Sequence, residues 1–349
     1  MQDIAIAGRK VGPSHPSFII AELSANHNHD INRAREIVKV AAECGADAIK
    51  LQTYTANTLT FDSNDESFQV SGTIWEGKNL YQLYEEAHLP WEWHEELFDY
   101  ARSLGMIAFS TPFDFTAVDF LENLNVPLYK IASSELVDIP LMRRVAATGK
   151  PVILSTGMGE LAEIDEAVRT LRDNGCSDLI LLKCTAAYPA PIEEANLATI
   201  PHMAQLFDVV AGLSDHTPGS TAPVVATVLG SRVIEKHLTL RRADGGPDSE
   251  FSMEPEEFAD MVKAVRAAES AIGTVRYAPT AKEMRSRDFR RSLFVVADVK
   301  AGDPFTPENV RSIRPATGLH TRHYDDVLGK TASHDIRAGK PLELSDLAG

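Results

Sequence analysis

The sequence predicts an α/β protein, a (β/α)8 TIM barrel followed by a small β-rich domain. Short apolar runs recur eight times between residues 18 and 238. Segments with apolar residues at helical spacing separate most of these runs. Near residue 275 the composition changes to a polar, basic stretch, and short β-like runs with turn residues follow. Eight strand and helix units in succession fit one closed barrel.

The apolar runs are largely continuous rather than alternating, as expected for parallel strands that are covered on both faces. The expected strands are residues 18–23, 48–53, 106–111, 128–133, 151–156, 179–184, 209–214 and 233–238. The expected helices are residues 31–46, 90–105, 117–125, 139–149, 161–175, 218–230 and 254–273. Several of these helical patterns end at glycine, the common residue just after a helix C-terminus.

Two insertions exceed the length that a minimal barrel loop needs. Residues 54–90 follow the second expected strand, and residues 241–253 follow the eighth. Long loops within a compact domain are usually functional, and both leave the carboxyl ends of the strands. The first insertion and the residues after it carry the aromatic residues Trp75, Tyr81, Tyr84, Trp91 and Trp93. These aromatics form the wall of a pocket, or else Trp91 and Trp93 begin a helix that packs on the barrel.

The domain boundaries follow from the change in composition. We expect a barrel domain over residues 1–275, a linker over 276–290 and a β-rich domain over 291–349. A domain as small as the last one buries little apolar surface by itself. We therefore expect it to dock on the barrel or on a second subunit.

The overall charge and composition exclude several classes of protein. The formal net charge of −16 argues against a nucleic-acid or anionic-membrane surface, because phosphates would be repelled. The N-terminal residues lack the pattern of a signal peptide, and no apolar stretch is long enough to span a membrane. The three cysteines, Cys44, Cys176 and Cys184, have no metal-ligand spacing. We expect them to be small buried apolar side chains in a reducing cytoplasm.

Two histidines come at the ends of the last two expected strands. His216 follows Asp215, and His237 comes two residues after Glu235. Because neighbouring parallel strands end at the same edge, the two imidazoles are expected to lie close together. Such a pair suits one divalent metal ion. The alternative is two structural histidines that hydrogen-bond near the sheet.

Four lysines lie within expected strands, namely Lys50, Lys130, Lys183 and Lys236. A lysine in a buried strand is costly unless it is paired, so four of them indicate a function. A ring of lysines and hydroxyls would bind a substrate that carries phosphate and carboxylate groups. A Schiff-base lysine is the competing interpretation.

Several segments together resemble the sialic acid synthase family over nearly the whole chain. They are AELSANHNHD, GADAIKLQTY, FSTPFD, YKIASSELVDIPL, ILSTGM, GLSDHT and VIEKHLTL. The tail is similar to the antifreeze-like (SAF) domain of that family. Three further segments, WEGKNLYQLYEEAHLPWEWH, CTAAYPAP and RADGGPDSEFSMEP, are similar to the pseudaminic acid synthase branch.

The resemblance implies a metal-dependent, C–C bond-forming transferase. The family condenses phosphoenolpyruvate with a 2-acetamido sugar. The branch implies 2,4-diacetamido-2,4,6-trideoxy-L-altrose as the sugar, and pseudaminic acid and phosphate as products. An N-acetylneuraminate or legionaminic acid synthase that uses a different sugar is the alternative. A catalytically inactive sugar-binding barrel is a further one.

The resemblance also implies roles for residues of this chain. Those near the reacting centre are Glu22, Glu135 and Glu235. Those for phosphoenolpyruvate are Lys50, Thr111, Lys130, Ser133, Ser155 and Ser214, and those for the sugar are Gln52, Tyr188, Asp248 and Arg314. The ligands of the divalent metal, Mn²⁺ or Mg²⁺, are His216 and His237.

The resemblance also bears on how the protein assembles and on one position where this sequence departs from the family. Arg314 lies in the tail, and the resemblance implies a homodimer in which it reaches the active site of the partner subunit. Ala186 replaces an asparagine that the family often uses on the phosphate side. Asn26 and His27 are expected either at the site or in shaping the loop after the first strand.

Overall fold

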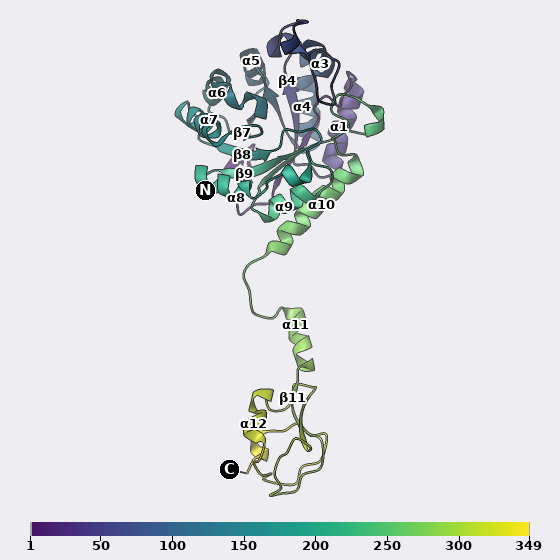
Figure 1. Ribbon diagram of the computed structural model, residues 1–349, viewed down its shortest axis with the longest axis vertical. Coiled ribbons are helices and arrows are strands. Elements are labelled where there is room, and N and C mark those ends of the chain that lie inside the picture. Colours follow the sequence, from purple (N-terminus) through teal and green to yellow (C-terminus); the bar gives the residue numbers. More distant parts are fainter. Residues whose placement is uncertain (1, 349) are drawn as a thin grey trace. The chain divides into compact units, whose positions relative to one another are not determined.

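The structure is a computed structural model that describes residues 2–348. The chain divides into two compact units, Met1–Gly273 and Thr274–Gly349. The first unit contains a barrel of strands surrounded by helices, and the second contains a small antiparallel sheet (Figure 1).

Eight parallel strands form the closed barrel of the first unit. Their order around the ring is β10-β3-β4-β5-β6-β7-β8-β9, so the ring follows the chain and closes between its first and last strands. This confirms the predicted (β/α)8 fold. The strands are β3 (Phe18–Glu22), β4 (Ala48–Thr53), β5 (Ile107–Pro112), β6 (Tyr129–Ile131), β7 (Val152–Ser155), β8 (Leu179–Cys184), β9 (Val210–Asp215) and β10 (Val233–His237).

Several helices of the first unit, among them α1 and α5, begin at residues whose side chains cap them. Asp30 accepts a hydrogen bond from the amide of Asn32, and Asp114 accepts from the amides of Thr116 and Ala117. The barrel helices are α1 (Ile31–Glu43), α4 (His94–Ser103), α5 (Phe115–Asn123), α6 (Ile139–Ala146), α7 (Leu161–Asp173), α8 (Thr199–Phe207), α9 (Thr221–Val228) and α10 (Pro255–Ile272). The sequence did not predict α8, whose proline and histidine weaken the helical pattern.

The insertion after β4 is also partly helical. It contains α2 (Ala56–Leu59) and α3 (Leu80–Ala87), where a loop was expected. Asn79 caps α3 by accepting from the amide of Gln82, and the side chain of Gln82 accepts in return from the amide of Asn79. The insertion is therefore an ordered segment with a defined inner face.

An N-terminal hairpin closes one end of the barrel. Strands β1 (Ile4–Ile6) and β2 (Arg9–Val11) pair in antiparallel fashion, and the sequence did not predict them. Their apolar side chains Ile4, Ile6 and Val11 join the cluster that fills the barrel interior at the amino ends of the strands. An open cavity along the barrel axis is thus left only at the carboxyl ends of the strands.

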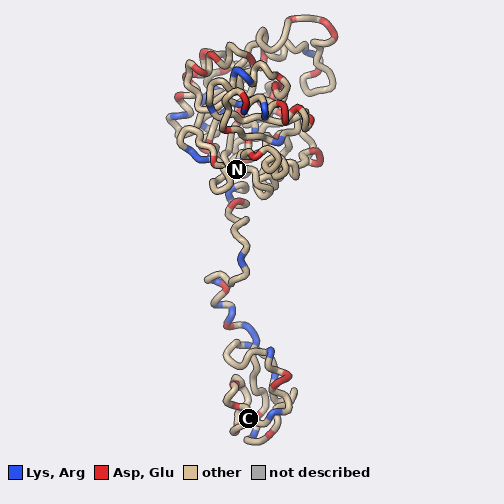
Figure 2. The backbone as a smooth tube through the Cα atoms, turned by 90° about the vertical axis from the view of Figure 1, so that its left-hand side faces the viewer, with Lys and Arg blue, Asp and Glu red and all other residues tan. Residues whose placement is uncertain are grey.

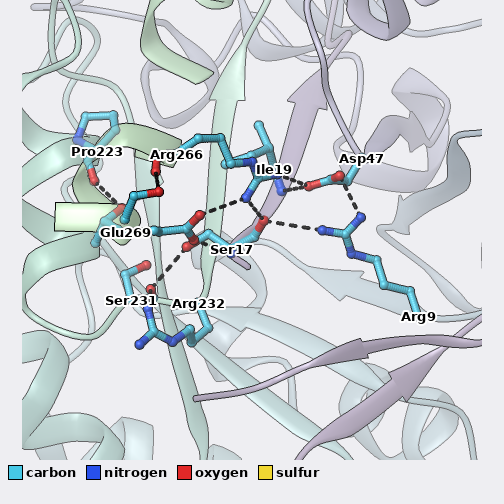
Figure 3. Close-up of polar contacts among 11 residues, drawn as sticks. Arg9, Ser17, Ile19, Asp47, Pro223, Ser231, Arg232, Arg266 and Glu269 are labelled. Carbon is cyan, nitrogen blue, oxygen red and sulfur yellow. Dashed lines mark hydrogen bonds and ion pairs between the residues drawn. The ribbon is translucent and has the colours of Figure 1, made fainter. Parts of the chain in front are cut away.

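Charged side chains tie α10 to the strands at this closed end (Figure 3). Asp47, just before β4, pairs with Arg9 at 2.6 Å and with Arg266 of α10 at 2.9 Å. Its carboxylate also accepts from the amide of Ile19 at 2.8 Å. Asp47 is only 14% exposed, so both ion pairs are partly shielded from water.

The second unit has its own apolar core. Strands β11 (Ser292–Val295) and β12 (Val310–Ile313) pair in antiparallel fashion, and the short helices are α11 (Ala281–Ser286) and α12 (Tyr324–Val327). Buried residues such as Leu293, Phe305 and Leu342 form the core. The expected linker contains α11, and basic residues predominate along it and its flanks (Figure 2). None of the described helices is long and apolar enough to cross a membrane.

The Asp47 network generates a stability prediction. Replacing Asp47 with Asn leaves two arginines without their shared carboxylate, so the first unit should lose about 2 kcal/mol of unfolding free energy. Scanning calorimetry should then record its midpoint roughly 4–8 °C lower. The control is Asp260→Asn, which breaks an ion pair to Lys263 whose side chains are both 76% exposed. That change should cost less than about 0.5 kcal/mol; equal losses in both variants would refute the structural role of Asp47.

Candidate active site

The two-residue alternation of the strands decides which polar side chains enter the barrel. On β10, Val233 packs in the interior cluster and Ile234 packs in the cluster on the outer side of the barrel, against the helices. Glu235 and His237 therefore point inward, and Lys236 points outward. The same alternation holds on each strand, and it brings inward-pointing side chains together above the apolar interior. They are Glu22, Lys50, Gln52, Thr111, Lys130, Ser155, Cys184, Ser214, Glu235 and His237.

The alternation corrects the expected ring of four lysines. Lys50 and Lys130 line the cavity, but Lys183 and Lys236 do not. Lys236 is buried on the outer side and pairs with Asp215 at 2.6 Å. Lys183 is half-buried and donates to the backbone carbonyl of the next residue at 2.7 Å. Only two lysines are therefore available to a ligand in the barrel.

A cavity of about 390 Å³ opens at the carboxyl ends of the strands. Many of the site residues predicted from the sequence line this cavity. They are Lys50, Gln52, Lys130, Ser133, Ser155, Tyr188, Ser214, His216, Glu235, His237 and Asp248. Three nominated residues lie beside the lining rather than in it, namely Glu22, Thr111 and Glu135. Arg314 is exposed in the second unit, just after β12.

Buried charges form a compact network on the floor of the cavity. The ammonium of Lys50 lies 2.5 Å from Glu22, 3.5 Å from Glu235 and 3.2 Å from the hydroxyl of Thr111. Lys130 lies 3.8 Å from the same oxygen of Glu235. Since these groups are almost completely buried, each charge depends on the others for compensation. An anionic ligand that pairs with Lys50 and Lys130 would therefore replace Glu22 and Glu235 as their partners.

The surroundings shift the pKa values of these buried groups in different directions. Burial lowers the pKa of Lys130, although Glu235 opposes the shift. Burial raises the pKa of Glu22 to about 7, against the attraction of Lys50. The pKa of Lys50 is raised because Glu22 and Glu235 outweigh its burial. Protonation of Glu22 near neutral pH would free Lys50 to pair with an anion.

His216 and His237 face each other at one side of the cavity, with ring centroids 5.3 Å apart. Nδ1 of His216 lies 3.0 Å from the carbonyl of Thr185, so it carries the proton and leaves Nε2 as an acceptor. Nδ1 of His237 is buried without a partner, and burial lowers the pKa of this imidazole, which favours its neutral form. Burial would lower the pKa of His216, but its contacts with Cys184 and with the carbonyl of Thr185 raise it. His237 is therefore held in the neutral form that binds metal ions, whereas His216 must lose a proton to bind one.

These two imidazoles fit a divalent ion whose other ligands come from outside the protein. Among residues 2–348, no group of three or more His, Cys, Asp or Glu side chains is placed to hold a metal. Two protein nitrogens would leave several coordination positions for water and substrate oxygens. Coordination positions that are open to water and substrate are a feature of catalytic metal sites, whereas structural sites are closed.

Aromatic residues and the loop after β10 also line the cavity, and Tyr188 packs directly on His216 with ring centroids 4.5 Å apart. Trp75 donates from its indole to the carbonyl of Pro247 at 2.7 Å and packs against Tyr188. Tyr84 of α3 also lines the cavity, as the aromatic insertion led us to expect. Trp91 and Trp93 do not line it, since Trp91 packs on Phe120 and Trp93 on the outer core. For these two residues the helix-start interpretation is correct.

The loops after the first and last strands are joined to each other. Asn26 donates to the carbonyl of Leu238 at 3.0 Å and to the hydroxyl of Ser252 at 2.8 Å. His27 is buried against Trp93, and burial lowers its pKa to about 3. Neither residue lines the cavity, so both shape the loop.

Sequence reasoning missed several residues that line the cavity, among them Ser24, Tyr54, Leu83, Cys184 and Phe251. Cys184 had a signal, because it comes at an expected strand end, but it was interpreted as a small buried apolar residue. Ser24 lies two residues beyond Glu22, after β3 has ended. The strand alternation no longer predicts there which way a side chain points. Leu83 was assigned to a loop and not to the inner face of a helix.

Glu135 generates a pH prediction. It lies in the turn Ser133–Val137, and burial raises the pKa of its carboxyl to about 7, opposed by Lys130. In the unfolded chain the group ionises near pH 4.5. Between pH 4.5 and 7 the Glu135 carboxyl is protonated in the folded protein and ionised in the unfolded chain. The free energy of unfolding therefore falls as the pH rises from about 4.5 through 7.

Replacing Glu135 with Gln removes this ionisation. The variant should gain stability relative to the natural protein as the pH rises from 5 to 8, by up to about 3 kcal/mol. Chemical denaturation at both pH values measures the difference. The exposed Glu166→Gln variant is the control and should show no such trend. A difference that stays constant with pH in Glu135→Gln would contradict the assignment.

Models of known families match both units of the chain. The NeuB family model matches residues 37–277, and the SAF domain model matches residues 290–348. The chain is 45% identical to the pseudaminic acid synthase of Helicobacter pylori over 334 residues, which are 95% of this chain and 98% of that protein. It is 35% identical to the N,N'-diacetyllegionaminic acid synthase of Campylobacter jejuni over 325 residues, 92% and 97% of the two chains.

Solved structures give the same result. The N-acetylneuraminic acid synthetase of Leptospira borgpetersenii matches with a TM-score of 0.73 and 32% identity, over 82% of this chain and 95% of that one. A truncated 3-deoxy-D-arabino-heptulosonate 7-phosphate synthase of Thermotoga maritima matches with a TM-score of 0.60 and 13% identity, over 78% and 94%, and shows the fold alone. The resemblance found in the sequence is confirmed, and the chain belongs to the NeuB family and carries a C-terminal SAF domain.

Proposed function

We propose that the chain is a pseudaminic acid synthase. It condenses phosphoenolpyruvate with 2,4-diacetamido-2,4,6-trideoxy-L-altrose to give pseudaminic acid and phosphate. The observation that carries the proposal is one cavity with buried lysines on its floor and two imidazoles at its side. The identity of 45% to pseudaminic acid synthases, against 35% to a legionaminic acid synthase, supports this choice of sugar.

The floor of the cavity binds phosphoenolpyruvate in this proposal. Lys50 and Lys130 neutralise its phosphate and carboxylate, and the inward hydroxyls donate hydrogen bonds to the same oxygens. These hydroxyls belong to Thr111, Ser133, Ser155 and Ser214. Before binding, the lysines pair with Glu22 and Glu235. Once the lysines pair with the ligand, these two carboxylates lose part of the neighbouring positive charge, and Glu22 takes up a proton.

The sugar lies above phosphoenolpyruvate, with its open-chain aldehyde toward His216 and His237. A divalent ion, Mn²⁺ or Mg²⁺, held by these two residues would supply Lewis acidity to the aldehyde oxygen. Gln52, Tyr188 and Asp248 hold the rest of the sugar. Trp75 and Tyr84 give this end of the cavity an apolar wall, which suits a 6-deoxy sugar with a methyl group.

The reaction forms one C–C bond and breaks one C–O bond. C3 of phosphoenolpyruvate attacks the aldehyde carbon, and water adds to the cationic C2. The tetrahedral product releases phosphate with cleavage of the C2–O bond. Glu22 and Glu135 orient the water and stabilise the positive charge at C2, and holding both reactants side by side lowers the barrier further.

The remaining expectations concern assembly and location. A homodimer that shares Arg314 between subunits stays a prediction, as does a cytoplasmic location. The same is true of the boundaries 1–275, 276–290 and 291–349.

Two lysines provide a matched test of the phosphate site. Lys130→Met removes an inward ammonium and should lower kcat/KM for phosphoenolpyruvate about 10- to 100-fold, since charge-assisted contacts are worth roughly 1.5–3 kcal/mol each. Lys183→Met removes an outward ammonium and should change kcat/KM less than about three-fold. Steady-state phosphate release measures both. Equal losses would contradict the inward and outward assignment.

The function itself is tested by phosphate release from phosphoenolpyruvate with Mn²⁺ and three acceptors. They are N-acetylmannosamine, the 2,4-diacetamido altrose and its legionaminic-type stereoisomer, with mass detection of the product. We expect turnover with the altrose sugar alone, and its loss in EDTA. Turnover with N-acetylmannosamine would retain the chemistry and refute the sugar. No release with any acceptor would refute the proposed function, and trapping by borohydride without a metal requirement would favour a Schiff-base aldolase.

A further inference from the structure

Ser24 has a backbone conformation that favours glycine. Its φ is +53°, in the left-handed region that L-residues rarely adopt. It is also 3% exposed and lies just beyond β3, at the rim of the cavity. A buried serine at such a position is strained, and strain of this kind concentrates at functional sites. Its side chain must therefore make contacts that glycine cannot.

The hydroxyl of Ser24 connects two residues of the sugar end of the cavity. It donates to Oδ2 of Asp248, a residue 224 positions away in the loop after β10. The same oxygen of Asp248 accepts from the amide of Ala25 at 3.3 Å. The side-chain amide of Gln52 donates to the Ser24 hydroxyl at 3.4 Å and to Glu22 at 3.2 Å.

The backbone of Ser24 belongs to the same network. Its amide donates to Oε1 of Glu22 at 3.0 Å, which is the oxygen that Gln52 also contacts. Ser24 thus links a carboxylate on the phosphoenolpyruvate floor to a carboxylate at the sugar end.

This network fixes how Asp248 faces the cavity. Oδ2 is occupied by the hydroxyl of Ser24 and the amide of Ala25, whereas Oδ1 has no hydrogen bond to any of the residues 2–348 that the structure describes. Trp75 holds the preceding residue by donating to the carbonyl of Pro247. Among the described residues no ion pair holds Oδ1, although the charges of His216 and Lys50 act on the Asp248 carboxylate. Oδ1 is thus free to accept from an N–H or O–H group of a ligand.

We propose that Ser24 is a positioning residue for sugar recognition. It holds Asp248 and Gln52 in one orientation, so that Oδ1 of Asp248 accepts a hydrogen bond from a donor group of the acceptor sugar. The site thereby selects sugars that present an N–H or O–H donor at this position and discriminates against those that do not. The inference rests on the proposed function, because it takes the ligand of this end of the cavity to be the acceptor sugar.

The test replaces Ser24 with Gly and with Ala. Both variants lose the hydroxyl, but glycine alone relieves the backbone strain, so Ser24→Gly should unfold at a higher temperature than Ser24→Ala. Because Ser24→Gly lacks the hydroxyl, its KM for the altrose sugar should rise at least ten-fold while its KM for phosphoenolpyruvate changes less than two-fold. Ser24→Ala keeps the strain, and it should show the same rise in KM.

Two controls separate positioning from general effects. Asn125 is exposed and also left-handed, with φ of +51°, and lies outside the catalytic cavity. Asn125→Gly also places glycine at a left-handed position, and it should leave both KM values unchanged. In an Asp248→Asn background, where the acceptor is already altered, adding Ser24→Gly should change sugar KM less than two-fold.

The outcomes distinguish this inference from the proposed function. If the natural protein releases phosphate with the altrose sugar but Ser24→Gly keeps its sugar KM, the inference alone is overturned. Independent, multiplicative effects of Ser24→Gly and Asp248→Asn on sugar KM would also overturn it. If the natural protein releases no phosphate with any acceptor, the proposed function fails, and the sugar-positioning role fails with it.

Discussion

Each barrel strand directs alternate side chains to opposite faces, and the chemistry of the cavity depends on that constraint. Lys50 and Lys130 enter the barrel, where Glu22 and Glu235 compensate their charges. A shift of one residue would place them against the helices, as happens to Lys236, which needs Asp215 there. Below this layer the apolar interior and the N-terminal hairpin close the barrel, so ligands reach the buried charges only from the carboxyl ends of the strands.

Closure of the ring has a second consequence, since it makes the first and last strands neighbours. Their loops are joined by the ion pair of Arg33 with Asp244 at 2.7 Å and by the contacts of Asn26 with Ser252 and of Ser24 with Asp248. The end of the cavity that we propose for the sugar is built from these two loops and from the insertion that carries Trp75. The floor that we propose for phosphoenolpyruvate is built largely from the strands. A change in the loops could therefore alter the preferred sugar without a change in the strands.

Sequence reasoning predicted the eight strands, their order and most of the polar residues at their ends, because buried parallel strands are short continuous apolar runs. That same continuity hid which side chains point inward, so Lys183 and Lys236 were wrongly grouped with Lys50 and Lys130. Helices α3 and α8 were missed because capping and tertiary packing, not periodicity, stabilise them. The left-handed backbone of Ser24 could not be predicted from a single sequence, because serine is not a residue that marks this conformation. The roles of the individual site residues remain predictions.

The most direct test of this account is a crystal structure of the protein with Mn²⁺ and phosphoenolpyruvate, with anomalous scattering used to locate the metal. The account predicts manganese bound by His216 and His237, with the phosphate and carboxylate of phosphoenolpyruvate within hydrogen-bonding distance of Lys50 and Lys130. It also predicts that Lys183 and Lys236 do not contact the ligand. Manganese on other residues, or phosphoenolpyruvate bound outside the ring of inward side chains, would contradict it.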